Sequence, residues 1–239
     1  MSWIIIDKRL PDASKKALTA YGSVLEFESS GVVYDAISGH PDIFICDTGS
    51  GLIVAPNSPL SFINKLNEIK VPYKTGNKPL GRAYPETSRF NAVVTKKYLI
   101  HNLKYTDKSI LDACDEKIQI HTRQAYTRCN LIALNDNAFI TSDKSIEKSL
   151  LKQKLNVLFV SPEEIVLPGF QYGFFGGCCG VHQQKFFISG SLKHFKYGNS
   201  VLSFIKENGL ETIELIDDNL FDCGGLFFIN NQNPLSVTL

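Results

Sequence analysis

Runs of hydrophobic residues separated by turn residues recur five times along this chain in the same order. Each unit has an apolar run, a turn, a second apolar run, an amphipathic stretch and a short β-rich run. Four units lie whole at 42–75, 91–121, 129–160 and 179–216. The fifth is divided, with GGLFFIN near the C-terminus and its remainder at the N-terminus. A period of roughly 40 to 50 residues is typical of propellers and solenoids, and the divided unit predicts a closed ring.

The spacing of apolar residues within one unit predicts its individual elements. Residues 42–57 hold two apolar runs on either side of DTGSG, which favours a β-hairpin. Leu60, Ile63, Leu66 and Ile69 then recur at three-residue steps, the stripe of an amphipathic helix. The unit therefore reads as two strands, a helix and a third strand.

Capping residues support the predicted helix ends. Asp143 precedes an apolar helical stripe and is a preferred N-cap residue, while Pro11 with Asp12 begins the first helix. Gly22 and Gly209 follow two of the helices, where a left-handed cap is expected.

Two stretches interrupt the repeating pattern. Residues 76–90 and 161–178 are rich in Pro and Gly and are predicted to be long loops that can carry function. Lys96, Lys97 and His101 are interpreted as the surface of a hairpin.

Composition narrows the classes of protein to be considered. The 239 residues are 44% apolar with a formal net charge of +1, so we expect one domain spanning residues 1–239. The near-neutral charge gives no electrostatic reason to expect nucleic acid or an anionic membrane as partner. No apolar run approaches the roughly 18 residues of a spanning helix, and the N-terminus lacks signal-peptide features. We expect a cytoplasmic protein.

Two segments at the starts of units carry a family resemblance. DCGGLFF (222–228) begins the divided unit, and PDIFICDTG (41–49) begins the next one. With the fivefold ββαβ repeat, the chain resembles the pentein superfamily of guanidino-group-modifying enzymes, which includes arginine and agmatine deiminases, dimethylarginine hydrolases and amidinotransferases. The resemblance implies an α/β, five-bladed propeller with pseudo-fivefold symmetry, on a divergent branch of the superfamily.

The resemblance assigns roles to residues in both segments. It implies that Cys223 is the nucleophile and that Asp47, with Asp42, holds the guanidinium of the substrate. The chemistry suits these residue types, because a thiolate attacks a resonance-stabilised cation better than a hydroxyl does. Carboxylates bind a guanidinium in a bidentate fork, and its bound charge lowers a thiol's pKa.

The histidine that should transfer protons is missing from its expected place. The resemblance puts it in the unit two before the divided one, on a predicted first strand that reads YTRCN (126–130). His121 and His182 are alternative proton carriers or solvated residues. Arg128 repels a guanidinium and instead favours an anionic ligand or none. We assign substrate binding to Asp42, Asp47, Arg128, Asn130 and Cys179.

The six cysteines allow several interpretations. Five fall on or just before predicted inner strands and therefore face the ring axis: Cys46, Cys129, Cys178, Cys179 and Cys223. They are interpreted chiefly as free, small hydrophobic residues, with a thiolate metal or redox site as the alternative. No C-x-x-C pair is present, and we assign no metal ligand and no cofactor. The glycines of GFFGGCCG (173–180) either permit crowded packing or supply an oxyanion hole for Cys179.

These features predict a cysteine-dependent hydrolase that acts on a small guanidino or amidino compound. The alternative is a catalytically degenerate pentein that serves as a small-molecule binding or assembly module, similar to the ribosome-associated anti-association initiation factor. A fold does not fix the chemistry, and the sequence leaves the substrate and the oligomeric state open.

Overall fold

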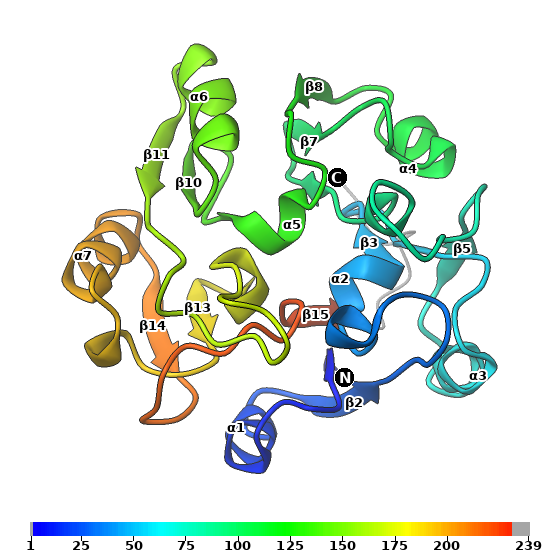
Figure 1. The fold of residues 1–239 in the computed structure, drawn as a ribbon, viewed down its shortest axis with the longest axis horizontal. Coiled ribbons are helices and arrows are strands. Elements are labelled where there is room, and N and C mark those ends of the chain that lie inside the picture. The colour runs from blue at the N-terminus through cyan, green and yellow to red at the C-terminus, as the bar shows by residue number, and fades with distance from the viewer. Residues whose placement is uncertain (1, 231–239) are drawn as a thin grey trace, which may run out of the picture.

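The protein is described by a computed structural model of residues 2–230, which form five small sheets around a common centre (Figure 1). Each sheet has three strands, in the orders β15-β1-β2, β3-β4-β5, β6-β7-β8, β9-β10-β11 and β12-β13-β14. The first sheet joins the two ends of the chain, because β15 pairs antiparallel with β1. The five-unit arrangement and the divided unit are confirmed.

The strands of each sheet follow one rule. The first and second strands pair antiparallel, and the second and third pair parallel, as β3, β4 and β5 show. The strands are β1 (Ser2–Asp7), β2 (Ser23–Phe27), β3 (Ile45–Asp47), β4 (Leu52–Val54), β5 (Tyr73–Thr75), β6 (Val93–Val94), β7 (Tyr98–His101), β8 (Ile118–His121), β9 (Leu131–Ala133), β10 (Ala138–Thr141), β11 (Asn156–Phe159), β12 (Cys179–His182), β13 (Lys185–Ile188), β14 (Glu211–Glu214) and β15 (Phe227–Asn230).

One helix connects the parallel strands of each sheet and lies on the outside of the ring (Figure 1). These helices are α1 (Asp12–Leu18), α3 (Leu60–Glu68), α4 (Lys108–Ala113), α6 (Lys144–Lys152) and α7 (Gly198–Glu207). A parallel pair needs such a crossover connection, so the helix in each unit follows from the strand order.

Short helical turns precede several first strands near the centre of the ring. They are α2 (Pro41–Phe44), α5 (Thr127–Asn130) and η3 (Gly176–Cys178), and further turns are η1 (Asp35–Ile37), η2 (Glu86–Ser88) and η4 (Leu192–His194). The strand predicted over 126–130 and the early start of the hairpin at residue 42 are therefore wrong. The short apolar segments there turn once before they enter the sheet, and hydrophobicity does not distinguish the two forms.

The caps and stripes behave largely as the sequence predicts. The side chain of Asp143 accepts hydrogen bonds from the amides of Ser145 and Ile146 at the start of α6. In α3 the buried residues are Phe62 and Leu66, whereas Leu60, the first residue of the helix, is 77% exposed. The predicted stripe is thus displaced by about half a turn at its start.

Two predicted glycine caps have different outcomes. Gly209 has φ +76° and ends α7 in the left-handed conformation. Gly22 does not adopt a positive φ. A Cβ at Gly22 would lie 2.7 Å from the carbonyl oxygen of Ser2, so close packing on β1 explains the residue.

The cores lie between neighbouring units. The largest hydrophobic cluster contains residues from the β3-β4-β5 and β6-β7-β8 sheets together with Phe227 of β15. His101, predicted on a hairpin surface, is instead fully buried. None of the described helices is long and apolar enough to cross a membrane.

Candidate functional site

A cavity of about 130 Å³ lies close to the axis on the side of the ring where the short helical turns gather. Residues of the η1 segment, α2, α5, the 161–178 loop and the segment before β15 line it: Tyr34, Ile37, His40, Ile43, Tyr126, Cys129, Leu167, Phe170, Tyr172, Phe174 and Asp222. Four of these residues come from the 161–178 loop, so that loop supplies much of the wall.

Aromatic side chains form most of this wall. The rings of Tyr34 and Phe170 lie 5.9 Å apart between centroids, and those of Tyr172 and Phe174 lie 6.4 Å apart. The hydroxyls of Tyr34 and Tyr126 are 3.2 Å apart, and Tyr126 forms a further short hydrogen bond with Thr87. Several ring faces and edges are therefore held in fixed positions around a small space.

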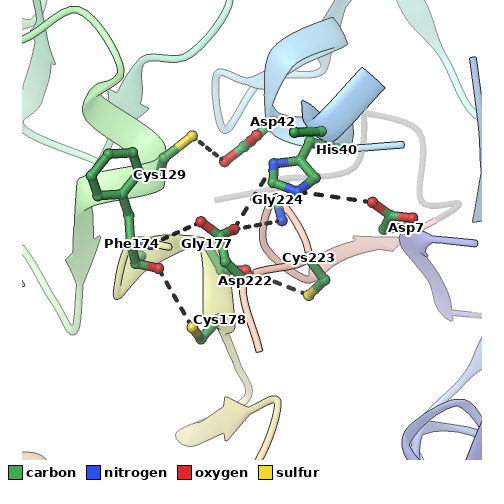
Figure 2. A network of polar contacts seen from close by, with 12 residues as sticks. Asp7, His40, Asp42, Cys129, Phe174, Gly177, Cys178, Asp222, Cys223 and Gly224 are labelled. Atoms are coloured by element: carbon green, nitrogen blue, oxygen red, sulfur yellow. Dashed lines mark hydrogen bonds and ion pairs between the residues drawn. The ribbon is translucent and has the colours of Figure 1, made fainter. Parts of the chain in front are cut away.

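His40 lies at the base of the cavity between two carboxylates (Figure 2). Its Nδ1 is 3.9 Å from Asp222 Oδ1, and its Nε2 is 3.9 Å from Asp7 Oδ2. The side chain is 1% exposed, and neither ring nitrogen has a hydrogen-bond partner among residues 2–230. Burial lowers the pKa of His40, and the two carboxylates oppose this effect only in part. Burial therefore favours the neutral form of the imidazole.

Close backbone packing fixes the position of His40. Gly224, which follows the Asp222-Cys223 pair, has φ +66°, and a Cβ there would lie 2.4 Å from the Cβ of His40. The amide of Asp42 also donates to the carbonyl oxygen of Gly224 at 3.2 Å. Only glycine permits this approach, so the segment before β15 holds α2 and its histidine in place.

Asp222 is buried beside His40 and is oriented by backbone amides. Its Oδ2 accepts from the amide of Phe174 at 2.8 Å, and its Oδ1 accepts from the amide of Gly224 at 3.1 Å. Burial raises the pKa of Asp222, while His40 and these amides act in the opposite direction. The carboxylate connects the cavity wall to its base.

Asp42 and Cys129 form a second buried pair (Figure 2). The Cys129 thiol donates to Asp42 Oδ2 at 3.1 Å, and the Nδ2 of Asn91 lies 3.2 Å from the same sulfur. The other carboxylate oxygen of Asp42, Oδ1, has no hydrogen-bond partner among the described residues. Burial raises the pKa of both groups. At Asp42 the charge of Arg128 opposes this effect, whereas the pKa of Cys129 is raised further by the neighbouring Asp42.

The buried carboxylates differ in how their charge is balanced. Asp7 forms a fork with Arg9, whose Nη2 lies 2.6 Å from Oδ2 and whose Nε lies 3.0 Å from Oδ1. Within residues 2–230, neither Asp42 nor Asp222 has a Lys or Arg nitrogen within 4.0 Å. The site thus holds two buried acids that contact no cation.

Cys223, which the family resemblance implies as nucleophile, lies one residue after Asp222 but faces another direction. Its Sγ lies 3.4 Å from the carbonyl oxygen of Gly177, and its side chain belongs to a hydrophobic cluster with Ile4, Ile6 and Leu226. Burial raises the pKa of this thiol well above its ordinary value, and Asp222 adds to the effect.

Asp47 and Arg128 line a different cavity, of about 200 Å³, formed chiefly by the first strands of the sheets. Asp47 is exposed and accepts from the amide of Gly49 at 2.9 Å. Arg128 donates to the carbonyl oxygens of Gly176 at 2.6 Å and Cys179 at 2.8 Å. Its guanidinium therefore ties α5 to β12.

The other sequence-assigned residues make internal contacts. Asn130 donates to the carbonyl oxygen of Tyr126 at 2.8 Å and accepts from the Ser142 hydroxyl at 3.1 Å. The Cys179 thiol donates to the carbonyl oxygen of Phe175 at 3.1 Å. Of the assigned set, Asp42 alone joins the cluster around His40.

The two histidines considered from sequence lie elsewhere. His121 ends β8 and accepts from the amide of Leu103 at 3.2 Å. His182 stacks on Phe228 with ring centroids 4.9 Å apart. Neither lines the cavity that contains His40.

His40, Asp222 and the cavity-facing position of Cys129 were not identified from the sequence. The signal was available, because GHPD (39–42) and DC (222–223) both stand just before first strands, where the five units converge. The histidines considered from the sequence, His121 and His182, belong to other units, whereas His40 stands just before the 42–75 unit.

The donor set does not favour a metal. No group of three or more His, Cys, Asp or Glu side chains within residues 2–230 is arranged to hold an ion. All six cysteines are free and buried.

Solved structures with a similar fold include guanidino-group-modifying enzymes. SxtG, an amidinotransferase of Microseira wollei, aligns with a TM-score of 0.56 at 9% identity, covering 95% of this chain and 94% of that one. DDAH of Pseudomonas aeruginosa, complexed with citrulline, aligns with a TM-score of 0.52 at 12% identity over 90% and 91% of the two chains. Agmatine deiminase of C. jejuni gives 0.51 at 10% identity over 89% and 87%.

These likenesses establish the fold, since the identities are low. A search of curated proteins finds no match to the chain. A family model described as a family of unknown function (DUF6873) matches residues 5–227. The chain therefore belongs to the DUF6873 family, and it has the pentein fold of the guanidino-group-modifying enzymes.

Proposed function

We propose that this protein binds a small guanidinium or amidinium cation in the aromatic cavity and hydrolyses one of its C–N bonds. The observation that carries the proposal is the pair of buried acids, Asp42 and Asp222, which contact no Lys or Arg nitrogen among the described residues. A buried carboxylate is costly unless it is paired. A planar cation that donates several hydrogen bonds supplies that pairing.

The aromatic wall supports a cationic ligand. Tyr and Phe faces attract cations within about 6 Å of the ring centroid, and Tyr34, Tyr126 and Phe174 all line the cavity. A cation bound there also stabilises a thiolate, which offsets the high pKa of the Cys129 thiol. Binding therefore prepares the nucleophile.

The residues of the cluster fit the steps of guanidine hydrolysis. Cys129 is the proposed nucleophile, and its proton passes to Asp42 Oδ2, 3.1 Å from the sulfur. The sulfur attacks the guanidinium carbon, and ammonia leaves with the proton from Asp42. His40, a neutral base, then takes a proton from water as water attacks the same carbon and the C–S bond breaks. The proton on His40 then returns to the departing Cys129 thiolate, and the proton released as the urea forms is taken by ammonia. The overall change is guanidinium plus water giving a urea and ammonium.

Cys223 is the nucleophile implied by family resemblance, and the geometry gives Cys129 precedence. Cys129 lines the cavity and contacts a carboxylate, whereas the Cys223 thiol points to the Gly177 carbonyl within a hydrophobic cluster. Asp47, the implied guanidinium anchor, lines the other cavity with Arg128. In this proposal Asp222, which lines the cavity, takes the anchoring role, and Asp42 receives the proton of Cys129.

Labelling with an amidine electrophile tests the assignment. We expect 2-chloroacetamidine to alkylate Cys129, as shown by intact mass and peptide mapping, and methylguanidine to slow the reaction. Cys129→Ser should abolish labelling, while Cys114→Ser, at a buried cysteine beyond the end of α4, should not. Labelling confined to Cys223 would reject Cys129 in favour of the nucleophile implied by resemblance.

Binding without turnover is the second candidate function. The raised pKa of Cys129 favours it, because a neutral thiol is a weak nucleophile. In that case methylguanidine raises the thermal stability of the protein, but neither ammonium nor a urea accumulates and the electrophile labels no cysteine. Release of ammonium that requires Cys129 would exclude this candidate.

A further inference from the structure

The lining of the cavity also indicates which guanidines fit. Among the described residues that line it, the only charged side chain is that of Asp222, and none is Lys or Arg. The nearest cations are engaged elsewhere, since Arg128 donates to backbone carbonyls and lines the other cavity. A carboxylate on the ligand would find no cationic partner there.

The size of the cavity sets a second limit. Its volume is about 130 Å³, slightly below the roughly 150 Å³ of an engineered apolar cavity that holds benzene. The guanidinium itself fills part of this space beside Asp222. Only a short tail remains to be accommodated, and it contacts Leu167, Phe170 and Tyr172 on the loop side.

We propose that the ligand is a compact monocation, a guanidine or amidine with a short apolar tail, and that guanidino amino acids and guanidino acids are excluded. The inference rests on the proposed function, because it concerns the same cavity. Exclusion follows from desolvation, since burying a carboxylate without a partner is unfavourable. The apolar wall gains instead from contact with an alkyl tail.

A matched pair of ligands tests this inference with the wild-type protein. Propylguanidine and 3-guanidinopropionate share a chain length and differ by the terminal carboxylate. We expect calorimetric titration to give at least tenfold tighter binding of propylguanidine, and no detectable binding of arginine. Equal or tighter binding of 3-guanidinopropionate or arginine would overturn the inference and leave the proposed function standing. If no guanidine binds, both proposals fall.

A substitution at the mouth of the cavity is expected to weaken this preference. Phe170 is 54% exposed and lines the cavity, so Phe170→Arg places a cation where a ligand's tail would end. We expect this variant to bind 3-guanidinopropionate at least tenfold more tightly than wild type does, with Phe170→Gln as the uncharged control. An equal gain in both variants would show that the lost ring, rather than the missing charge, determines exclusion.

Discussion

Two fully buried histidines in this protein have opposite surroundings. At His101, Nδ1 is 2.7 Å from the Thr106 hydroxyl and Nε2 is 2.7 Å from the carbonyl oxygen of Ala125. At His40, both nitrogens lack hydrogen-bond partners within the described chain, and the nearest carboxylate oxygens are 3.9 Å away. Burial lowers the pKa of both side chains, that of His101 to about 4.

The difference separates a structural residue from a candidate functional one. A buried polar group whose hydrogen bonds are all made within the protein fixes the local packing and requires no ligand to satisfy it. One without partners carries a desolvation cost that the fold alone does not offset. Both ring nitrogens of His40 and the Oδ1 of the nearby Asp42 lack partners among the described residues, beside the buried groups Asp222 and Cys129. Such clustering is typical of ligand sites.

The largest expected effect is on stability, when each histidine is truncated in turn. His101→Ala leaves the Thr106 hydroxyl and the Ala125 carbonyl without their buried partner and opens a cavity. We expect a loss of about 3 to 5 kcal/mol in the free energy of unfolding, measured by urea denaturation. His40→Ala breaks no hydrogen bond and should cost about 1 to 2 kcal/mol. Equal losses would contradict the distinction drawn between the two sites.

The next effect is on the pH dependence of stability. His101 has a folded-state pKa of about 4, against 6.5 in the unfolded chain. The unfolded state therefore binds more protons, and stability falls as pH drops from 6.5 toward 4. The loss reaches about 3 kcal/mol. His40 acts in the same direction, whereas the raised pKa values of Asp42 and Asp222 act in the opposite one.

Comparison with His101→Gln isolates the contribution of one histidine. Because glutamine does not titrate, the stability advantage of wild type over the variant should shrink by about 3 kcal/mol between pH 7 and pH 4. Urea unfolding of both proteins at several pH values measures the difference. A constant difference across that range would show that His101 does not titrate as its burial implies.

The fivefold repeat could be predicted from the sequence, whereas the short helical turns near the centre of the ring could not. The five units, the divided unit and the α6 cap at Asp143 follow from hydrophobic spacing and capping chemistry. The one-turn helices α2 and α5 could not be predicted in this way, because four residues are too few to show a helical period. The side chains of these helices therefore point in directions that the predicted strands did not indicate.

Those directions explain why the candidate site was only partly predicted. Asp42 was identified, but Cys129 was treated as one of several axial cysteines, and its contact with Asp42 spans 87 positions of sequence. His101 was expected on the surface of a hairpin. It is buried instead, and its Nε2 contacts the carbonyl oxygen of Ala125. Sequence periodicity predicts which face of a helix or strand is buried. Contacts between side chains of different units depend instead on how the ring closes.

The smallest effect is the response of each histidine site to a ligand. A ligand at a free concentration ten times its dissociation constant stabilises the folded state by about 1.4 kcal/mol. We expect methylguanidine at that concentration to stabilise wild type and His101→Gln equally, because the two regions are separate.

Asp222→Asn should lose this stabilisation, since a neutral amide cannot form an ion pair with the cation. Asp217→Asn, at an exposed carboxylate beside Lys193, is the matched control and should keep it. Thermal unfolding with sodium chloride at equal ionic strength supplies the baseline. If His101→Gln loses the response while Asp222→Asn keeps it, the cluster around His40 is not the binding site.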